Sequence, residues 1–292
     1  EFRRCSSDLL DSMLDHAAVD RFKKHANNPC HPHLMGSAEQ PETFFQHNEA
    51  RNVFYDESVD IIKGVMDQVN ESIGTDYKPF NYYGAKDATD VIIAMGSVCE
   101  TAAEVVDYLN ESGRKVGLIK VRLFRPFSSK YLLQEIPRTV KNIAVLDRTK
   151  EPGSNGEPLY LDVISALADS DDLNPRLTRG RYGLGSKDTQ PGDIIAVYDN
   201  MASDKPKKEF TISIIDDVTN LSLERTSNPI VSAKGTVACK FWGLGADGTV
   251  GANKNSVKII GDHTDKYVQA YFQYDSKKSG GVKIGRASCR GR

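Results

Sequence analysis

The sequence has few cysteines, and their spacing does not group them. The 292 residues contain five, at positions 5, 30, 99, 239 and 289, with no C-x-x-C pair. An odd set of scattered thiols does not suit a disulfide framework and indicates a reduced, intracellular protein. Iron–sulfur clusters and zinc sites need closely spaced ligands, so we expect no metal site built within this chain alone.

Long apolar runs and an excess of one charge are also missing. No run approaches the roughly 20 apolar residues of a membrane span, and the first 20 residues lack the apolar core of a signal peptide. The formal net charge is −2, which gives no reason to expect a nucleic acid or a membrane surface as partner. With 39% hydrophobic and 27% charged residues, the composition is typical of a globular protein.

Residues 1–78 show helical patterns and no strand pattern. One helix is predicted over 8–26 and a longer helical region over about 41–73. The later part of that region places apolar residues at steps of three and four, and Gly74 follows at a usual stopping position. Helices without a sheet to cover make a poor domain, so we interpret this segment as the end of a larger one.

A βαβ unit begins near residue 90. The apolar run "VIIAM" (91–95) predicts a strand buried on both faces. Ser97 and Glu100 form the pattern of a capping box, an amphipathic helix follows, and "VGLI" (116–119) predicts the next strand. This order implies a parallel sheet with a right-handed crossover.

The alternation continues, with helices predicted near 129–136, 158–168 and in "GDIIAVYDNM" (192–201), and a strand at 143–146. The stretch "RLTRGRYGLGSKDT" (176–189) predicts a further strand followed by a glycine turn. We therefore predict an α/β fold with a doubly wound parallel-sheet domain over 79–205. The polar stretch "ASDKPKKE" is interpreted as a linker to a further α/β domain over 206–285. Residues 286–292 are basic and lack periodicity, and we interpret them as a cloning remainder.

The stretch "GLGADG" (243–248) matches G-x-G-x-x-G, which alone is a weak signal. A dinucleotide site needs a buried strand before it and a helix after it. Here "CKFW" is a poor buried strand, Gly251 would interrupt the helix, and "VKIIGD" follows too soon. Backbone N–H groups of a glycine loop, with Lys254 nearby, suit a phosphate or pyrophosphate group instead. Tight turns with solvated lysines remain an equal alternative.

Six segments carry a resemblance to a known family: "NPCHPHLMGSAEQPETFFQHNEARN", "NYYGAKDATDVIIAMGSVCETAAEVVDYLNESGRKVGLIKVRLFRPF", "IAVLDRTKEPGSNGEPLYLDV", "GRYGLGSKDT", "ACKFWGLGADGTVGANKNSVKIIGD" and "QAYFQYDSKKSGG". In this order, from about residue 20 to 283, the chain resembles pyruvate:ferredoxin (flavodoxin) oxidoreductase. The resemblance implies an internal fragment of a large enzyme that converts pyruvate and CoA to acetyl-CoA and CO2. The electrons pass to ferredoxin or flavodoxin.

The resemblance also implies the cofactors and the domain roles. Thiamine diphosphate, Mg2+ and [4Fe–4S] clusters would bind outside this chain, so no catalytic residue is assigned to it. Residues 1–78 would end a thiamine-binding domain, 79–205 would resemble the C-terminal domain of transketolases, and 206–285 would begin a CoA-associated domain. The parent enzyme would be a homodimer in the cytoplasm or in an anaerobic organelle such as a hydrogenosome.

On this interpretation the glycine loop holds the phosphates of CoA. The residues expected to contribute are Gly245, Asp247, Gly248, Thr249, Gly251, Asn253, Lys254, Lys277 and Lys278. Two alternatives remain: a related enzyme that uses another 2-oxoacid or an NADP-linked acceptor, and a stand-alone CoA- or nucleotide-binding module.

Overall fold

The computed structural model describes residues 11–32, 36, 38–232, 235–274 and 280–290. It divides into two compact units, one ending at Tyr55 and the other beginning at Asp56. Lys277 and Lys278 lie outside the described residues.

The first unit is helical. Helix α2 (His16–Lys23) begins where the side chain of Asp15 accepts a hydrogen bond from the N–H of Ala18. Helix α3 (Pro41–Glu49) has proline in its first turn, a position that needs no N–H donor. Neither helix contains a buried residue, so the described part of this unit has no core of its own.

Helix α4 (Asn52–Ile73) crosses from the first unit into the second. The helical region predicted over 41–73 is therefore two helices, α3 and α4, which begin and end within that range. Gly74 follows α4 with φ of +69°, a conformation that glycine adopts without strain. Within the second unit, the hydroxyl of Tyr131 donates to the Asp60 carboxylate of α4 at 2.5 Å.

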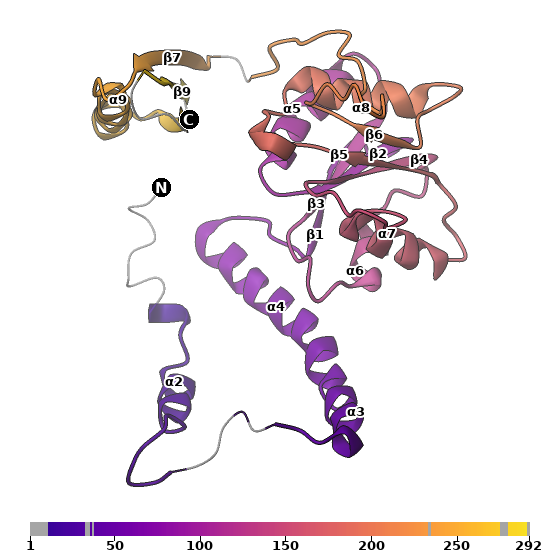
Figure 1. The fold of residues 1–292 in the computed structure, drawn as a ribbon, viewed down its shortest axis with the longest axis vertical. Helices are drawn as coiled ribbons and strands as arrows, with labels where there is room; N and C mark the ends of the chain where they lie inside the picture. Colours follow the sequence, from indigo (N-terminus) through magenta and orange to yellow (C-terminus); the bar gives the residue numbers. More distant parts are fainter. Residues whose placement is uncertain (1–10, 33–35, 37, 233–234, 275–279, 291–292) are drawn as a thin grey trace. The chain divides into compact units, whose positions relative to one another are not determined.

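A six-stranded sheet forms the centre of the second unit (Figure 1). Its strands are β1 (Phe80–Gly84), β2 (Asp90–Met95), β3 (Val116–Val121), β4 (Asn142–Asp147), β5 (Arg176–Arg181) and β6 (Glu209–Thr211). The order across the sheet is β1-β3-β2-β4-β5-β6. The pairings are parallel except for β1, which runs antiparallel to β3.

Helices cover both faces of this sheet. Helices α5 (Val98–Glu111) and α8 (Pro191–Ala202) pack on one face, and α6 (Ser129–Glu135) and α7 (Pro158–Ala168) on the other. Strand β2 serves both cores, because Ile92 belongs to the first and Ile93 to the second. The predicted doubly wound α/β fold is confirmed.

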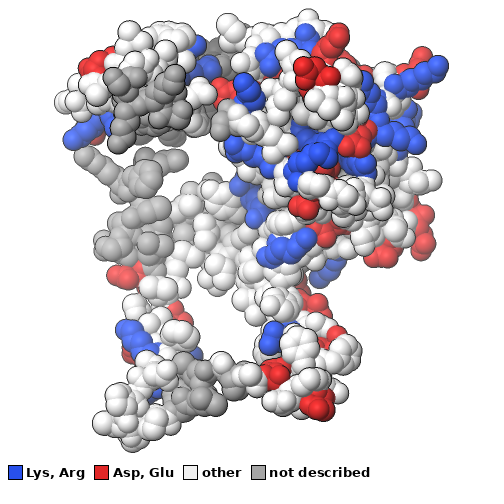
Figure 2. Space-filling model, viewed as in Figure 1, with Lys and Arg blue, Asp and Glu red and all other residues white. Residues whose placement is uncertain are grey.

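The surface of this domain carries both charges. Figure 2 shows Lys, Arg, Asp and Glu side chains interspersed over it on the face in view. Arg114 pairs with Asp199 at 2.7 Å and Arg125 with Asp162 at 2.7 Å. Exposed pairs of this kind stabilise a fold by about 0–1 kcal/mol each, so the two cores carry the stability.

One predicted cap is wrong. Ser97 precedes α5 but adopts helical angles (φ −64°, ψ −23°), and its side chain makes no capping hydrogen bond. The carboxylate of Glu100 pairs instead with the ammonium of Lys120 on β3, at 3.0 Å. A residue that caps a helix through its side chain usually has an extended backbone, and the helical angles of Ser97 do not provide it.

The sheet extends beyond the linker expected after residue 205. Strand β6 pairs with β5, and Phe210 is fully buried. The chain then returns along α8, where Arg225 pairs with Asp193 at 2.9 Å. Leu223 and Val231 pack against the same core. Residues 206–231 therefore continue the sheet domain, and we propose the domain boundary after residue 231.

The last elements form a separate three-stranded sheet. Strands β7 (Val237–Leu244), β8 (Tyr267–Tyr274) and β9 (Val282–Arg290) lie in the order β7-β9-β8, and both outer strands are antiparallel to β9. Helix α9 (Thr249–His263) joins the parallel outer strands, which makes a split βαβ unit. The boundary proposed at 285/286 falls inside β9, and the assignment of 286–292 stays a prediction.

Across the described ranges, no helix combines the length and the apolar character needed to cross a membrane.

Candidate anion-binding loop

The glycine stretch forms a strand–loop–helix turn. Strand β7 ends at Leu244 and α9 begins at Thr249. Between them, Gly245 has φ of +57° and Gly248, which precedes the helix, has φ of +82°. The N–H of Gly245 donates to the carbonyl of Gly281 at 2.8 Å, so the segment before β9 fixes the loop.

Two local expectations for this stretch are wrong. Gly251 does not interrupt the helix, and "VKIIGD" lies within α9. The strand "CKFW" does form, although most of its residues are exposed. Pairing with β9 along its whole length compensates for the weak apolar pattern.

The Asp247 side chain fills the centre of the turn. Its Oδ2 accepts from the N–H of Leu244 at 2.9 Å, and its Oδ1 accepts from the N–H of Thr249 at 3.0 Å. Thr249 is the first residue of α9, and first-turn N–H groups have no partner within their own helix. The carboxylate therefore bridges the end of β7 and the start of α9.

Gly243 permits this close packing. A Cβ at that position would lie 2.5 Å from Thr249 Oγ1 and 2.8 Å from Asp247 Oδ2. Real side chains do not tolerate such distances, so only glycine lets the first turn of α9 approach β7. The sequence motif predicted phosphate-binding glycines but not this packing role, which depends on how closely the helix approaches the strand in the folded chain.

Asn253 lies one turn further along α9, on its sheet side. It is completely buried, and neither its Nδ2 nor its Oδ1 has a hydrogen-bond partner among the described residues. A Cβ at Gly285 of β9 would be 2.2 Å from Asn253 Nδ2, so the amide faces the sheet. Leaving a buried polar group without a partner costs about 1–3 kcal/mol, and a polar ligand or water that reaches the amide would offset it.

Lys254 follows Asn253 on α9, and its ammonium lies near a ring of β8. It is exposed, its ammonium lies 5.7 Å from the Phe272 ring centroid, and no ion pair of its side chain occurs within the described ranges. The loop thus offers backbone N–H groups, a hydroxyl and a cation. The structure brings together Gly245, Asp247, Gly248, Thr249 and Gly251, and it turns Asn253 inward.

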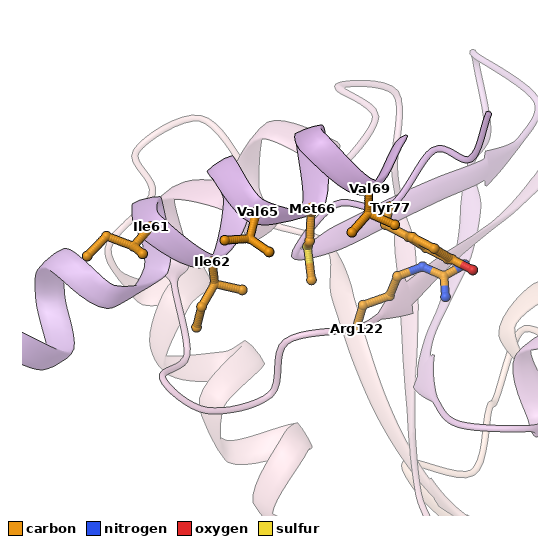
Figure 3. Close-up of a pocket in the computed structure, with 7 residues that line it drawn as sticks. All are labelled: Ile61, Ile62, Val65, Met66, Val69, Tyr77 and Arg122. Atoms are coloured by element: carbon orange, nitrogen blue, oxygen red, sulfur yellow. The ribbon is translucent and has the colours of Figure 1, made fainter. Parts of the chain in front are cut away.

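An apolar groove lies between α4 and the sheet domain, with a volume of about 300 Å³ (Figure 3). Its lining is Ile61, Ile62, Val65, Met66, Val69, Tyr77 and Arg122. Arg122 Nε donates to Asn81 Oδ1 at 2.8 Å, and the guanidinium lies 4.8 Å from the Tyr77 ring centroid. Arg122 is the one formally charged side chain of this lining, and the other residues present apolar or aromatic surface.

At the carboxyl edge of the large sheet, Asp147 has a structural role. Its two oxygens accept from the N–H groups of Leu159 and Tyr160 at 3.0 and 3.1 Å, which caps the start of α7. Burial raises the pKa of Asp147 to about 6, against the opposing effect of these two hydrogen bonds. Neighbouring Arg181 contacts Glu157 and Glu209.

Asp147 gives the domain a pH-dependent stability. Because its folded pKa lies above the unfolded value of 3.8, the fold favours the neutral acid. This contribution is complete below pH 4 and is lost as pH rises through 6. The parent chain loses this contribution as pH rises, and Asp147→Asn does not. We therefore expect the free energy of unfolding of Asp147→Asn, relative to that of the parent chain, to rise by up to about 3 kcal/mol between pH 4 and pH 7, the equivalent of a pKa shift of about two units. Urea unfolding of both chains at each pH measures this difference, and a constant difference would contradict the assignment.

The described residues contain no group of three or more His, Cys, Asp or Glu side chains placed to hold a metal ion. Burial raises the pKa of the Cys99 thiol to about 11, so this thiol is protonated at neutral pH and is a poor ligand or nucleophile.

Comparison with known proteins identifies the relatives. Residues 88–194 match the family described as "Pyruvate:ferredoxin oxidoreductase core domain II". Pyruvate-flavodoxin oxidoreductase of Enterobacter agglomerans is 55% identical over 94% of this chain and 23% of its own length. Pyruvate:ferredoxin oxidoreductase of Moorella thermoacetica is 56% identical over 94% and 23%. The predicted resemblance is confirmed, and the chain spans about a quarter of the length of these relatives.

Two further similarities are more distant in function or in sequence. "Pyruvate dehydrogenase [NADP(+)]" of Cryptosporidium parvum is 46% identical over 96% of this chain and 15% of its own. Among solved structures, 2-oxoglutarate:ferredoxin oxidoreductase from Magnetococcus marinus, with 2-oxoglutarate, coenzyme A and succinyl-CoA bound, is 16% identical. The similarity covers 61% of this chain and 28% of the chain of that structure, with a TM-score of 0.39.

Proposed function

We propose that this chain, which is similar over 94% of its length to pyruvate:ferredoxin and pyruvate:flavodoxin oxidoreductases, forms part of such an enzyme. The reaction converts pyruvate and CoA to acetyl-CoA and CO2 and passes two electrons to ferredoxin or flavodoxin. The sequence identity carries this proposal. Because the chain spans 23% of those relatives, we assign binding and support to it rather than the carbon–carbon cleavage.

Thiamine diphosphate, Mg2+ and [4Fe–4S] clusters belong to the proposed whole enzyme. The described residues of this chain do not fit them, since they supply neither grouped thiolates nor an acidic metal cluster. No step of the reaction is therefore derived through these groups. In the proposed enzyme their ligands come from other parts of the polypeptide.

The loop between β7 and α9 fits the phosphates of CoA. Glycines at 245 and 248 hold the backbone in left-handed conformations, which are typical of loops that bind anions through backbone N–H groups, although the N–H of Gly245 donates to the carbonyl of Gly281. The first turn of α9 favours negative charge through its dipole, and the exposed ammonium of Lys254 adds a cation. Thr249 adds a hydroxyl at the start of the helix, whereas Asn253, which was expected to contribute, is turned toward β9. These groups bind and orient a ligand and break no bond.

Lys254 offers the sharpest test of this site. We expect Lys254→Ala to weaken CoA binding about tenfold, because one charge-assisted hydrogen bond contributes roughly 1.5 kcal/mol. Calorimetric titration of the 292-residue chain measures the Kd. Lys258→Ala is the matched control, since it removes the same charge one turn further along α9. Equal effects of both substitutions, or none, would reject the assignment.

Two other functions stay open to experiment. The similarity to an NADP-linked pyruvate dehydrogenase supports a variant with a different electron acceptor, and another 2-oxoacid is a further option. A stand-alone CoA-binding module is the alternative of a different class. If the native reading frame continues into cysteine-rich and thiamine-binding segments, the enzyme is favoured, whereas a stop codon favours the module.

The whole enzyme is proposed to be an intracellular homodimer, in the cytoplasm or an organelle such as a hydrogenosome. Sedimentation of the complete protein tests the dimer. Ferredoxin and flavodoxin reduction assays test the electron acceptor.

A further inference from the structure

We propose that Asp247 is an internal substitute for the anionic ligand of the β7–α9 loop, and that a phosphate group binds only when this carboxylate leaves. The sequence interpretation placed Asp247 among the residues that assist binding. The geometry points to a competitor. The identity of the ligand as CoA rests on the proposed function, whereas the competition itself rests on the loop alone.

The carboxylate marks an anion position. Two backbone donors from different elements, Leu244 at the end of β7 and Thr249 at the start of α9, converge on its two oxygens at 2.9 and 3.0 Å. A phosphate group presents oxygens with similar spacing and charge, and helix N-termini bind phosphate through such N–H groups. The protein's own carboxylate therefore occupies the place that a ligand phosphate would take.

The two anions exclude each other. Each N–H makes one good hydrogen bond, so a phosphate oxygen cannot share Leu244 N–H and Thr249 N–H with Asp247. Two negative groups at hydrogen-bonding distance also repel each other strongly. Binding must therefore displace the carboxylate, and the free energy of breaking its hydrogen bonds to the Leu244 and Thr249 N–H groups is subtracted from the free energy of binding.

The loop has room for this exchange. Gly248 follows Asp247, and a Cβ placed on Gly248 or on Gly251 would meet no atom within 4 Å. Glycine adopts left- and right-handed backbone conformations about equally well, so the backbone after Asp247 can change conformation at little cost.

A second observation supports a ligand at this end of the helix. Asn253 follows Thr249 by one turn, so both lie on the sheet side of α9. The Asn253 amide is fully buried and has no hydrogen-bond partner in the part of the chain that the structure describes.

Charge removal at this position gives a direct test. We expect Asp247→Asn to bind inorganic pyrophosphate about five- to tenfold more tightly than the parent chain, because one hydrogen bond of the competing carboxylate is weakened and its charge is gone. Calorimetry on the 292-residue chain measures the Kd. Asp265→Asn, which removes the same charge from the turn after α9, is the control and should leave affinity unchanged. Asp247→Ser is a second variant that keeps a capping oxygen if the amide variant fails to fold.

A structural readout accompanies the affinities. In the parent chain, pyrophosphate should shift the backbone amide resonances of Leu244 and Thr249 as the carboxylate leaves. In Asp247→Asn these shifts should be complete at lower ligand concentration. Circular dichroism of both variants separates a loss of helix capping from a change in binding.

The outcomes are distinct for the two proposals. Unchanged or weaker pyrophosphate binding by both Asp247 variants, or no binding by any chain, overturns the competition. Tighter pyrophosphate binding without any CoA binding leaves the competition standing and rejects the CoA assignment. If the parent chain binds CoA and neither variant binds it more tightly, the CoA assignment stands and the competition is rejected.

Discussion

Replacing Arg181 by alanine is expected to lower the free energy of unfolding by about 3–5 kcal/mol, the usual cost of removing one partner from a buried ion pair. Arg181 is 4% exposed, lies 3.6 Å from the Glu157 carboxylate and contacts that of Glu209. Without the guanidinium, Glu157, which is 4% exposed, would remain buried without its cation. Urea unfolding of the 292-residue chain at neutral pH measures the change.

Arg138→Ala serves as the control for that experiment. Arg138 also pairs with a carboxylate, that of Asp172 at 3.4 Å, but both side chains are more than two-thirds exposed. Such a pair contributes about 0–1 kcal/mol. Comparable losses of unfolding free energy for Arg181→Ala and Arg138→Ala would contradict the idea that burial of the Arg181 network determines its contribution to stability. A double replacement of Arg181 and Glu157 by apolar residues should recover part of the loss, because no buried charge is left alone.

Replacing Phe210 by alanine is expected to destabilise the sheet domain by about 3–5 kcal/mol, as for other large-to-small changes in a packed core. Phe210 lies in β6, beyond the linker that the sequence suggested, and it is fully buried. Its ring occupies the space above Gly180 of β5, where a Cβ would come within 2.3 Å of Phe210 Cε2. Thermal and urea unfolding of the chain give the measurement.

Ile215→Ala is the matched control for Phe210→Ala. Ile215 is 94% exposed, so its truncation should change stability by less than about 0.5 kcal/mol. Truncation of the chain supplies a second test of the same point. A chain that ends after residue 205 should fail to fold, whereas one that ends after residue 231 should retain a cooperative transition. Equal stability of the two would restore the boundary expected from the sequence.

Local patterns were sufficient where each element buries its own apolar residues. The run "VIIAM" predicted β2 because a strand covered on both faces must be apolar throughout, and Ile92 and Ile93 do face different cores. Helix α4 was predicted from its apolar stripe, although the break between α3 and α4 was not. Strand β1 was missed, since "FNYYG" mixes polar and aromatic residues and exists through its antiparallel pairing with β3.

The candidate site also has features that the sequence predicted and features that depend on tertiary contacts. Glycines and lysines predicted the position of the loop, because backbone freedom and charge are visible in the residue types. The role of Asp247 was not visible, since its partners are backbone N–H groups on two elements that only the fold brings together. The approach of Thr249 to Gly243 likewise depends on how α9 packs on β7.

By itself, the sequence determined the α/β class, the order of most helices and strands, the family resemblance and the place of the glycine loop. These follow from periodicity, punctuation and residue chemistry, which act over a few neighbouring positions. The tertiary structure decided that β6 belongs to the central sheet, that Asp147 caps a helix twelve residues away, and that Asp247 occupies the anion position. Each of these depends on contacts between groups from separate elements, and patterns over a few neighbouring residues do not reveal which distant residues will be in contact.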